Sequence, residues 1–167
     1  MNAGTKAIIA LGSNLGDSRA IILEAMKRLQ ELSSRPLLRS SLYETAPVDC
    51  PPGSPPFINA AVLLTPQLHE TAESLLTKLQ AMEKEFGRRP KQTHNEARLL
   101  DLDLIAFGAE SRSTPTLTLP HPRAHLRRFV LAPLAEIAPE HILPGQAKPV
   151  RQLLAELDTT EVVTRQV

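Results

Sequence analysis

Apolar residues recur in this chain with two different periods, and the order of those periods limits the architectures available to it. Short β-branched or alternating runs, typical of strands, are bounded by Gly and Pro. Longer segments with apolar residues on one helical face follow the first and third of these runs. The sequence therefore predicts strands at residues 6–11, 37–44, 57–64 and 99–107, and helices from Asp17 to Leu32 and over residues 68–86.

The order strand, helix, strand, strand, helix, strand is typical of a ferredoxin-like α+β fold, with two helices on one face of a mainly antiparallel sheet. Asp17 is expected to cap the first helix, and Gly87 stands where a left-handed residue ends the second. Further short helices are expected near residues 129–137 and 150–157. The other face of the sheet is expected to stay open for a ligand.

Composition narrows the functional classes. A chain of 167 residues with 42% hydrophobic content supports a single domain, residues 1–167, around one core. Because 19 basic residues nearly balance 18 acidic ones, no overall field favours nucleic acid or an anionic membrane. Cys50 has no partner for an internal disulfide, and the first residues have too short an apolar run for a signal peptide or membrane span. A cytoplasmic protein is expected.

Two carboxylates stand close together in the segment Leu100-Asp101-Leu102-Asp103-Leu104. Strand geometry directs the three leucines to one face, and Asp101, Asp103, Ile105 and Phe107 to the other. Side chains two residues apart on a strand can converge on a hard cation. The segment therefore predicts either a metal site or a solvated polar face.

Phe57 and Asn59 share one face of their expected strand, opposite Ile58 and Ala60. A ring offers a stacking surface, and a carboxamide offers a donor and an acceptor together. This pair suits a flat heterocycle such as a pterin or purine, although ordinary packing beside a surface Asn gives the same pattern.

The segment between Arg88 and Arg98 is basic and lacks periodicity, so we expect a flexible cationic loop that closes over phosphate. The alternative is a solvated loop. Gly12-Ser13-Asn14-Leu15-Gly16-Asp17 lacks the Lys of a P-loop and predicts only a turn and a cap. His121, within Leu119-Pro-His-Pro-Arg123, either contacts a nucleotide or braces a turn.

Six segments in this order and spacing resemble the 6-hydroxymethyl-7,8-dihydropterin pyrophosphokinase family. They cover most of the chain, and the Leu-Asp-Leu-Asp segment with Asn-Ala-Ala upstream is specific to that family. The matching segments are Ala10-Leu-Gly-Ser-Asn-Leu-Gly16, Tyr43-Glu-Thr-Ala-Pro47, Phe57-Ile-Asn-Ala-Ala61, Arg98-Leu-Leu-Asp-Leu-Asp103, Leu119-Pro-His-Pro-Arg123 and Pro133-Leu-Ala-Glu-Ile-Ala-Pro139.

The resemblance implies an α/β sandwich on a ferredoxin-like core. It also implies transfer of the diphosphate of ATP to the pterin hydroxymethyl group, with two Mg²⁺ ions and release of AMP. Asp101 and Asp103 are the implied metal ligands, and they act in catalysis together with Arg88 and Arg98. The implied pterin pocket is formed by Phe57, Asn59 and Phe129, completed by backbone groups of Thr45, Pro47 and Val48. The implied ATP site is formed by Glu83, Arg88, Arg98, Leu104, Thr118, His121 and Arg127.

The chain departs from the family pattern at several positions. Asn95-Glu96-Ala97 replaces the usual Trp-Gly-Pro before Arg98, so loop closure is expected to differ. Thr116 stands where an arginine is common, and Pro122 where an aromatic residue is common. Phe57 replaces the frequent Tyr but keeps the aromatic ring.

Two other functions remain open at this point. One is a magnesium-dependent nucleotide hydrolase, which would release AMP without a pterin acceptor. The other is a non-enzymatic ligand-binding module, because the ferredoxin-like fold does not fix function. We expect a monomer that acts on small molecules.

Overall fold

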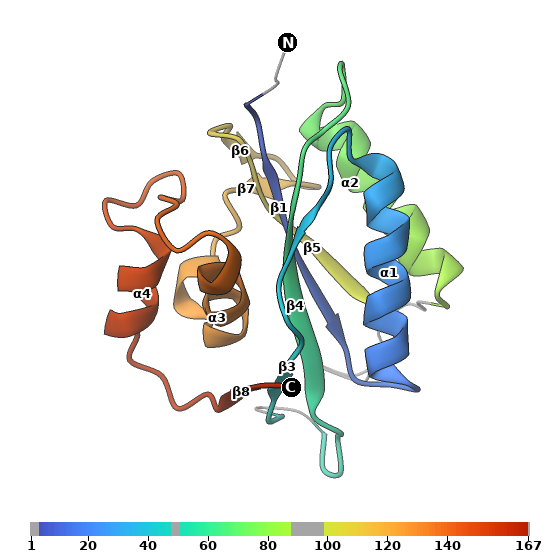
Figure 1. The fold of residues 1–167 in the computed structure, drawn as a ribbon, viewed down its shortest axis with the longest axis vertical. Helices are drawn as coiled ribbons and strands as arrows, with labels where there is room; N and C mark the ends of the chain where they lie inside the picture. Colours follow the sequence, from blue (N-terminus) through green and yellow to red (C-terminus); the bar gives the residue numbers. More distant parts are fainter. Residues whose placement is uncertain (1–3, 48–50, 88–98, 167) are drawn as a thin grey trace.

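A central antiparallel sheet separates two layers of helices (Figure 1). The computed structural model describes residues 4–47, 51–87 and 99–166. Within these residues the main sheet has six strands in the order β5-β1-β4-β3-β8, and β2 also pairs with β4. Its strands are β1 (Ala7–Ser13), β2 (Leu38–Arg39), β3 (Tyr43–Thr45), β4 (Phe57–Leu64), β5 (Asp101–Phe107) and β8 (Val163–Arg165).

The strands and helices up to β5 form the predicted ferredoxin-like arrangement. β1 lies between β4 and β5 and is antiparallel to both. The single strand expected over residues 37–44 is instead two short strands, β2 and β3. Between them the Ser40 hydroxyl accepts the backbone N–H of Ala61, so a side chain takes the place of a ladder carbonyl.

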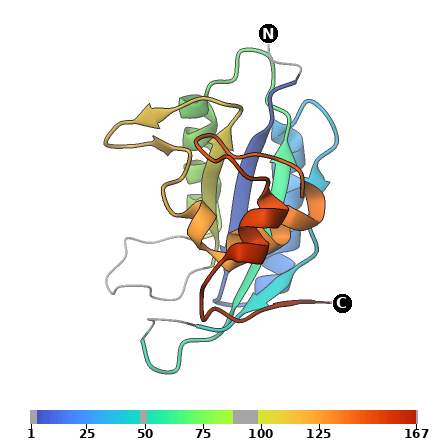
Figure 2. The ribbon, with the colours of Figure 1, turned by 90° about the vertical axis from the view of Figure 1, so that its left-hand side faces the viewer.

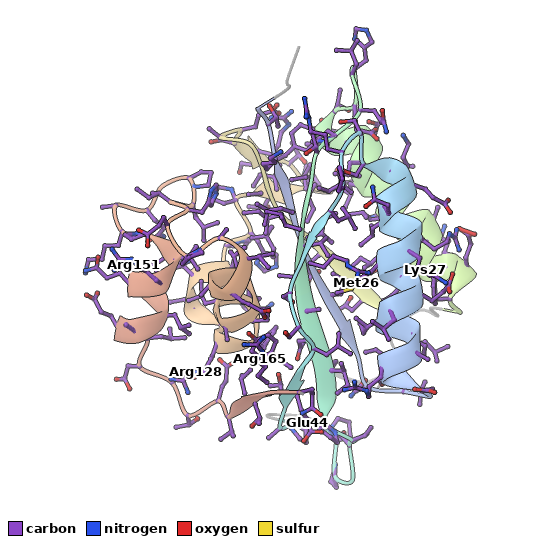
Figure 3. All side chains as sticks on the ribbon, viewed as in Figure 1. Met26, Lys27, Glu44, Arg128, Arg151 and Arg165 are labelled. Atoms are coloured by element: carbon purple, nitrogen blue, oxygen red, sulfur yellow. The ribbon has the colours of Figure 1, made fainter. Side chains whose placement is uncertain are left out.

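Two helices cover the first face of the sheet, α1 (Ser18–Leu32) and α2 (Ala72–Glu85). Figure 3 shows Met26 of α1 directed toward the sheet and Lys27 directed away from it. Asp17 caps α1 as predicted, accepting the N–H of Ala20. Helix α2 begins later than residue 68, because Thr71 and Ser74 form a capping box.

The sequence analysis predicted that the second face of the sheet would be open, and this prediction is wrong for part of that face. Helices α3 (Arg128–Ile137) and α4 (Val150–Glu156) lie across part of it, which Figure 2 shows from that side. Val130, Leu131 and Leu134 of α3 pack with sheet residues that include Ala61 and Ile105. Proline-rich connections surround these helices, with a 3-10 turn at Ala124–Leu126 and a small hairpin formed by β6 (Arg112–Ser113) and β7 (Thr118–Leu119).

Strand β5 contains a bulge that corrects the predicted face of Phe107. Ile9 pairs with Leu104 and Ile8 with Ala106, so Ile105 has no partner on β1. The extra residue reverses the alternation. Phe107 is consequently buried beneath α1 and α2 rather than on the face of Asp101 and Asp103.

The C-terminal strand β8, which the sequence analysis missed, pairs with β3 and lies beside α3. Glu136 of α3 ties these elements together (Figure 3 labels Arg165). Its carboxylate accepts hydrogen bonds from the Tyr43 hydroxyl at 2.8 Å and from the N–H and hydroxyl of Ser41, both at 2.9 Å. Arg165 of β8 lies 3.4 Å from the same carboxylate.

The environment of this network shifts the pKa of Tyr43 and of Glu136. Burial, followed by the hydrogen bond to Glu136, raises the pKa of Tyr43 to about 12. Burial would raise the pKa of Glu136, but the hydrogen bonds from Ser41 and Tyr43 outweigh it, and the pKa lies below its ordinary value of 4.5. The network thus favours the ionised carboxylate.

Glu136→Gln should make the protein's stability less sensitive to acid. Because the pKa of Glu136 is lower in the folded state, its stabilising effect is present above pH 4.5 and is lost as the pH falls through the folded pKa. At pH 7 we expect the substitution to cost about 1–3 kcal/mol in free energy of unfolding. Urea unfolding of Glu136→Gln and of the unsubstituted protein at pH 7 and pH 3.5 measures this. An equal loss of unfolding free energy on acidification in the two proteins would contradict it.

Candidate active site

Polar side chains lie on β4 and β5 where the face covered by α3 continues toward the C-terminal end of β1. In this part of the sheet Gly12 of β1 lies between Asn59 of β4 and Asp101 of β5, its direct partners on each side. Opposed residues on antiparallel strands have Cα atoms about 4.5–5.5 Å apart. A carboxamide and a carboxylate therefore flank a glycine across three adjacent strands.

Asn59, Gly12 and Asp101 form one row of cross-strand partners. In the next row on the same face, Asp103 lies opposite Ala10, which pairs on its other side with Ala61. Asp101 and Asp103 are both partly exposed, whereas Leu102 between them is buried with the helices α1 and α2. The two carboxylates thus share one face of β5, as alternation predicts. Beside them on this face β1 presents Gly12 and Ala10, two small residues.

Two neighbouring side chains approach Gly12 closely. A Cβ atom at this position would lie 3.1 Å from Asn59 Nδ2 and 3.7 Å from Phe57 Cδ1. Gly12 is not among the described residues with a positive φ, so its backbone conformation is open to other residues. A glycine at this position therefore leaves space beside Phe57 and Asn59, and its role is not to form a turn.

The carboxamide of Asn59 is held in one orientation. Thr45 of β3 donates its hydroxyl to Asn59 Oδ1 at 2.6 Å, and both residues are buried. With Oδ1 engaged by Thr45, Nδ2 is the group that faces Gly12. The family resemblance implied a role for the Thr45 backbone in the pterin pocket. The contact of its side chain with Asn59 was not predicted, because it depends on the pairing of β3 with β4.

Phe129 stands at the start of α3, partly buried against the second apolar cluster. The guanidinium carbon of Arg127 lies 5.4 Å from the centroid of its ring, within range of a cation–π contact. An aromatic surface and a cation are therefore adjacent at the N-terminal end of this helix.

His121 is anchored to β5 through its backbone. Its N–H donates to the carbonyl of Ile105, the bulged residue, at 2.8 Å. The Nδ1 atom accepts the N–H of Arg123 at 3.2 Å, so the neutral ring carries its proton on Nε2. Burial, then the charges of Arg127 and Arg123, lower the pKa of His121, while Asp101 opposes the shift. The shift favours the neutral ring.

Two residues implied as ATP ligands, Glu83 and Leu104, lie on the side of β5 opposite Asp101 and Asp103. Glu83 of α2 is buried, and its carboxylate accepts the backbone N–H of Leu102 at 2.7 Å from the side of the helices. Leu104 is buried in the cluster beneath those helices. Thr118 is exposed in the hairpin strand β7.

Other predicted site residues are at the limits of the described chain. Pro47 is exposed just after β3. Val48, Arg88 and Arg98 lie outside the described residues, as does the basic segment between the two arginines. The structure therefore leaves their predicted contacts with pterin or phosphate as predictions.

The two carboxylates suit magnesium better than a closed structural metal site. Among residues 4–47, 51–87 and 99–166, no three His, Cys, Asp or Glu side chains gather closely enough to hold a metal by themselves. Mg²⁺ is commonly bound by one or two carboxylates together with substrate phosphates and water. A pair of partly exposed carboxylates on one face of β5 fits that kind of site.

No helix within the described part of the chain is long and apolar enough to cross a membrane.

Comparisons with known proteins agree with these features. The family model for 7,8-dihydro-6-hydroxymethylpterin-pyrophosphokinase (HPPK) matches residues 8–139. A 2-amino-4-hydroxy-6-hydroxymethyldihydropteridine pyrophosphokinase from Synechocystis is 36% identical over 93% of this chain and 78% of its own length. The enzyme of the same name from Haemophilus influenzae is 37% identical over 90% of this chain and 89% of its own.

A solved structure supports the fold. The wild-type HPPK-DHPS of Plasmodium falciparum with pteroate superimposes with a TM-score of 0.70 over 91% of this chain, at 15% identity. This chain spans 42% of that longer protein. From the family match and the two relatives that it covers over most of their length, the chain belongs to the HPPK family, the 7,8-dihydro-6-hydroxymethylpterin-pyrophosphokinases.

Proposed function

We propose that this chain transfers the diphosphate of ATP to the hydroxymethyl group of 6-hydroxymethyl-7,8-dihydropterin, a step in folate biosynthesis. The hydroxyl oxygen attacks the β-phosphorus, the bond from that phosphorus to the α,β-bridging oxygen breaks, and AMP leaves. The observation that carries the proposal is the row of Asn59, Gly12 and Asp101 across three strands. In this row a carboxamide suited to a pterin edge and a carboxylate suited to a metal–phosphate complex stand on the two sides of one strand, which supports the proposal.

The pterin is proposed to bind over Gly12. Phe57 and Phe129 stack on the ring, and Asn59, held by Thr45, donates from Nδ2 to an acceptor on the pterin edge. Backbone groups of Thr45, Pro47 and Val48 complete the pocket. A rigidly bound ring keeps its hydroxymethyl group directed toward β5, which lowers the entropic cost of the attack.

ATP is proposed to bind beside β5. Asp101 and Asp103 would hold two Mg²⁺ ions, which when bound neutralise charge on the bridging phosphate oxygens. The Nε2 proton of His121 and the guanidinium of Arg127 are available to phosphate oxygens near Asp101. Arg88 and Arg98 are proposed to supply further cations for catalysis.

The remaining implied ATP contacts are assigned more narrowly. Thr118 is proposed as a contact from the exposed hairpin. Leu104 and Glu83 are proposed to act from the opposite side of β5, Glu83 by fixing the backbone of Leu102 between the two aspartates.

Gly12→Ala should weaken pterin binding while leaving the fold intact. The added methyl group would press on Asn59 Nδ2 at 3.1 Å and occupy the proposed ring position, whereas no left-handed backbone conformation is violated. Overpacking of this kind costs about 1–3 kcal/mol, so the pterin dissociation constant should rise by roughly 5- to 150-fold. Titration calorimetry measures it, with Gly4→Ala as a control because nothing lies near a Cβ there. Unchanged pterin affinity in Gly12→Ala would place the ring elsewhere.

We further propose that residues 1–167 act as one catalytic domain, as a cytoplasmic monomer on small molecules. The described residues assigned to the two substrates come from the main sheet, the helices packed on it, their connections and the β6–β7 hairpin of the same chain, which supports a site completed within one chain. The near balance of charge supports a role that involves neither nucleic acid nor a membrane surface.

The decisive assay is AMP formation from ATP and Mg²⁺, with and without 6-hydroxymethyl-7,8-dihydropterin. We expect AMP to appear only when the pterin is present, together with one equivalent of pterin diphosphate. AMP release at the same rate without the acceptor would instead identify a nucleotide hydrolase. Pterin binding with no AMP formation under any condition would identify a binding module.

A further inference from the structure

The C-terminal segment, residues 159–166, joins two elements that carry proposed pterin contacts. On one side β8 pairs with β3, and Val163 is the partner of Thr45. The backbone N–H of Ala46 also donates to the carbonyl of Val162 at 3.3 Å. On the other side the segment reaches the N-terminus of α3, where Phe129 stands (Figure 3 labels Arg128 at this end of the helix).

Glu161 makes the contacts with α3. Arg128 Nη1 donates to the backbone carbonyl of Glu161 at 2.7 Å, and the backbone N–H of Phe129 donates to Glu161 Oε1 at 3.4 Å. The second carboxylate oxygen accepts the hydroxyl of Thr159 at 3.2 Å, which orients the side chain. Glu161 thus receives a hydrogen bond from the backbone of a proposed stacking residue.

Helix α3 lacks a cap of its own. Its N-cap residue, Arg127, makes no side-chain capping bond, and no acidic residue lies in the first turn. A helix N-terminus presents unpaired N–H groups and a partial positive charge, so a carboxylate there is stabilising. Glu161 supplies both the acceptor and the charge from a segment 32 residues farther along the chain.

The same segment therefore sets the distance between the two sides of the pocket. Thr45, which pairs with Val163, holds the Asn59 carboxamide from β3. Phe129, which binds Glu161, contributes the ring from α3. Movement of residues 159–166 would change the position of Phe129 relative to Asn59.

We propose that Glu161 is a positioning residue of the pterin pocket, which caps α3 from the C-terminal segment and fixes Phe129 opposite the β3 and β4 side. The inference rests on the proposed pterin site. It concerns residues beyond the family match, which ends at residue 139. Glu161 does not contact the substrate, and its effect is confined to the geometry of the stacking residue.

The test compares Glu161→Ala with Glu161→Gln in the full chain, by titration calorimetry with the pterin and with a non-hydrolysable ATP analogue plus Mg²⁺. Glu161→Ala should raise the pterin dissociation constant by about 3- to 10-fold, within the range for loss of a helix cap, and change that of the ATP analogue by less than 2-fold. Glu161→Gln keeps an amide oxygen that accepts from Phe129, so it should restore most of the pterin affinity.

Glu156→Ala is the matched control, because Glu156 is also C-terminal and ion-paired, with Lys148, but lies on α4. It should leave both dissociation constants unchanged. Thr159→Val removes the hydroxyl that orients Glu161 and should weaken pterin binding, although less than Glu161→Ala. This second variant tests the inference if Glu161→Ala folds poorly.

A lower melting temperature in Glu161→Ala with unchanged pterin affinity would overturn the inference, since Glu161 would then be purely structural. Equal weakening of pterin and ATP analogue would overturn it as well. Failure of the unsubstituted protein to bind the pterin would instead remove the proposed function on which the inference rests.

Discussion

Asp101→Asn and Asp103→Asn should each lower turnover by at least ~100-fold, the scale for loss of a key electrostatic contact in a transition state. Each substitution keeps the size of the side chain but removes a negative charge that binds the proposed magnesium ions. Folding should change little, because both side chains are partly exposed on the face opposite the α1 and α2 core. Steady-state AMP formation at saturating ATP, Mg²⁺ and pterin measures the effect.

Asp158→Asn provides the matched control, since it makes the same chemical change at an exposed position after α4. It should keep full turnover. Near-normal activity in either Asp101→Asn or Asp103→Asn would remove that carboxylate from the proposed metal site. A large loss of thermal stability in these variants, in proportion to the loss of activity, would point to a structural role.

Phe57→Ala should weaken pterin binding by about 1–3 kcal/mol, the scale for stacking a base on an aromatic side chain. ATP binding should be largely unaffected, because Phe57 lies on β4, two strands from Asp101 and Asp103 on β5. Phe57→Tyr keeps the ring and should bind the pterin nearly as well as the unsubstituted protein. Equal pterin dissociation constants for Phe57→Ala and Phe57→Tyr would refute a stacking role.

Much of the fold was predictable because local patterns and long-range packing agree. The alternation in residues 57–64 and the caps at Asp17 and Gly87 are local signals, and β4, α1 and α2 form accordingly. The position of Phe107 was not predictable from alternation, because the bulge at Ile105 depends on how β5 pairs with β1. Ile105 itself lies on the second face, as alternation predicted. Coverage of the second face by α3 and α4 likewise depends on packing between distant segments.

The candidate site was likewise predictable only where local sequence patterns determine it. The shared faces of Asp101 with Asp103, and of Phe57 with Asn59, follow from the two-residue period of a strand. Gly12 gave no more than a turn signal in the sequence, because its importance comes from its partners on β4 and β5. Glu161 gave no signal, since its contact with Phe129 spans 32 residues. The β-branched run Val162-Val163-Thr164 was the one local indication of β8.

The proposed reaction requires the pterin and the metal–phosphate complex to meet across the row of Asn59, Gly12 and Asp101. A crystal structure with 6-hydroxymethyl-7,8-dihydropterin, Mg²⁺ and a non-hydrolysable ATP analogue tests this directly. We predict the pterin ring over Gly12 between Phe57 and Phe129, with Asn59 Nδ2 on its edge, and two magnesium ions on Asp101 and Asp103 between the ring and the triphosphate. A pterin bound away from Gly12, or magnesium bound without either aspartate, would contradict it.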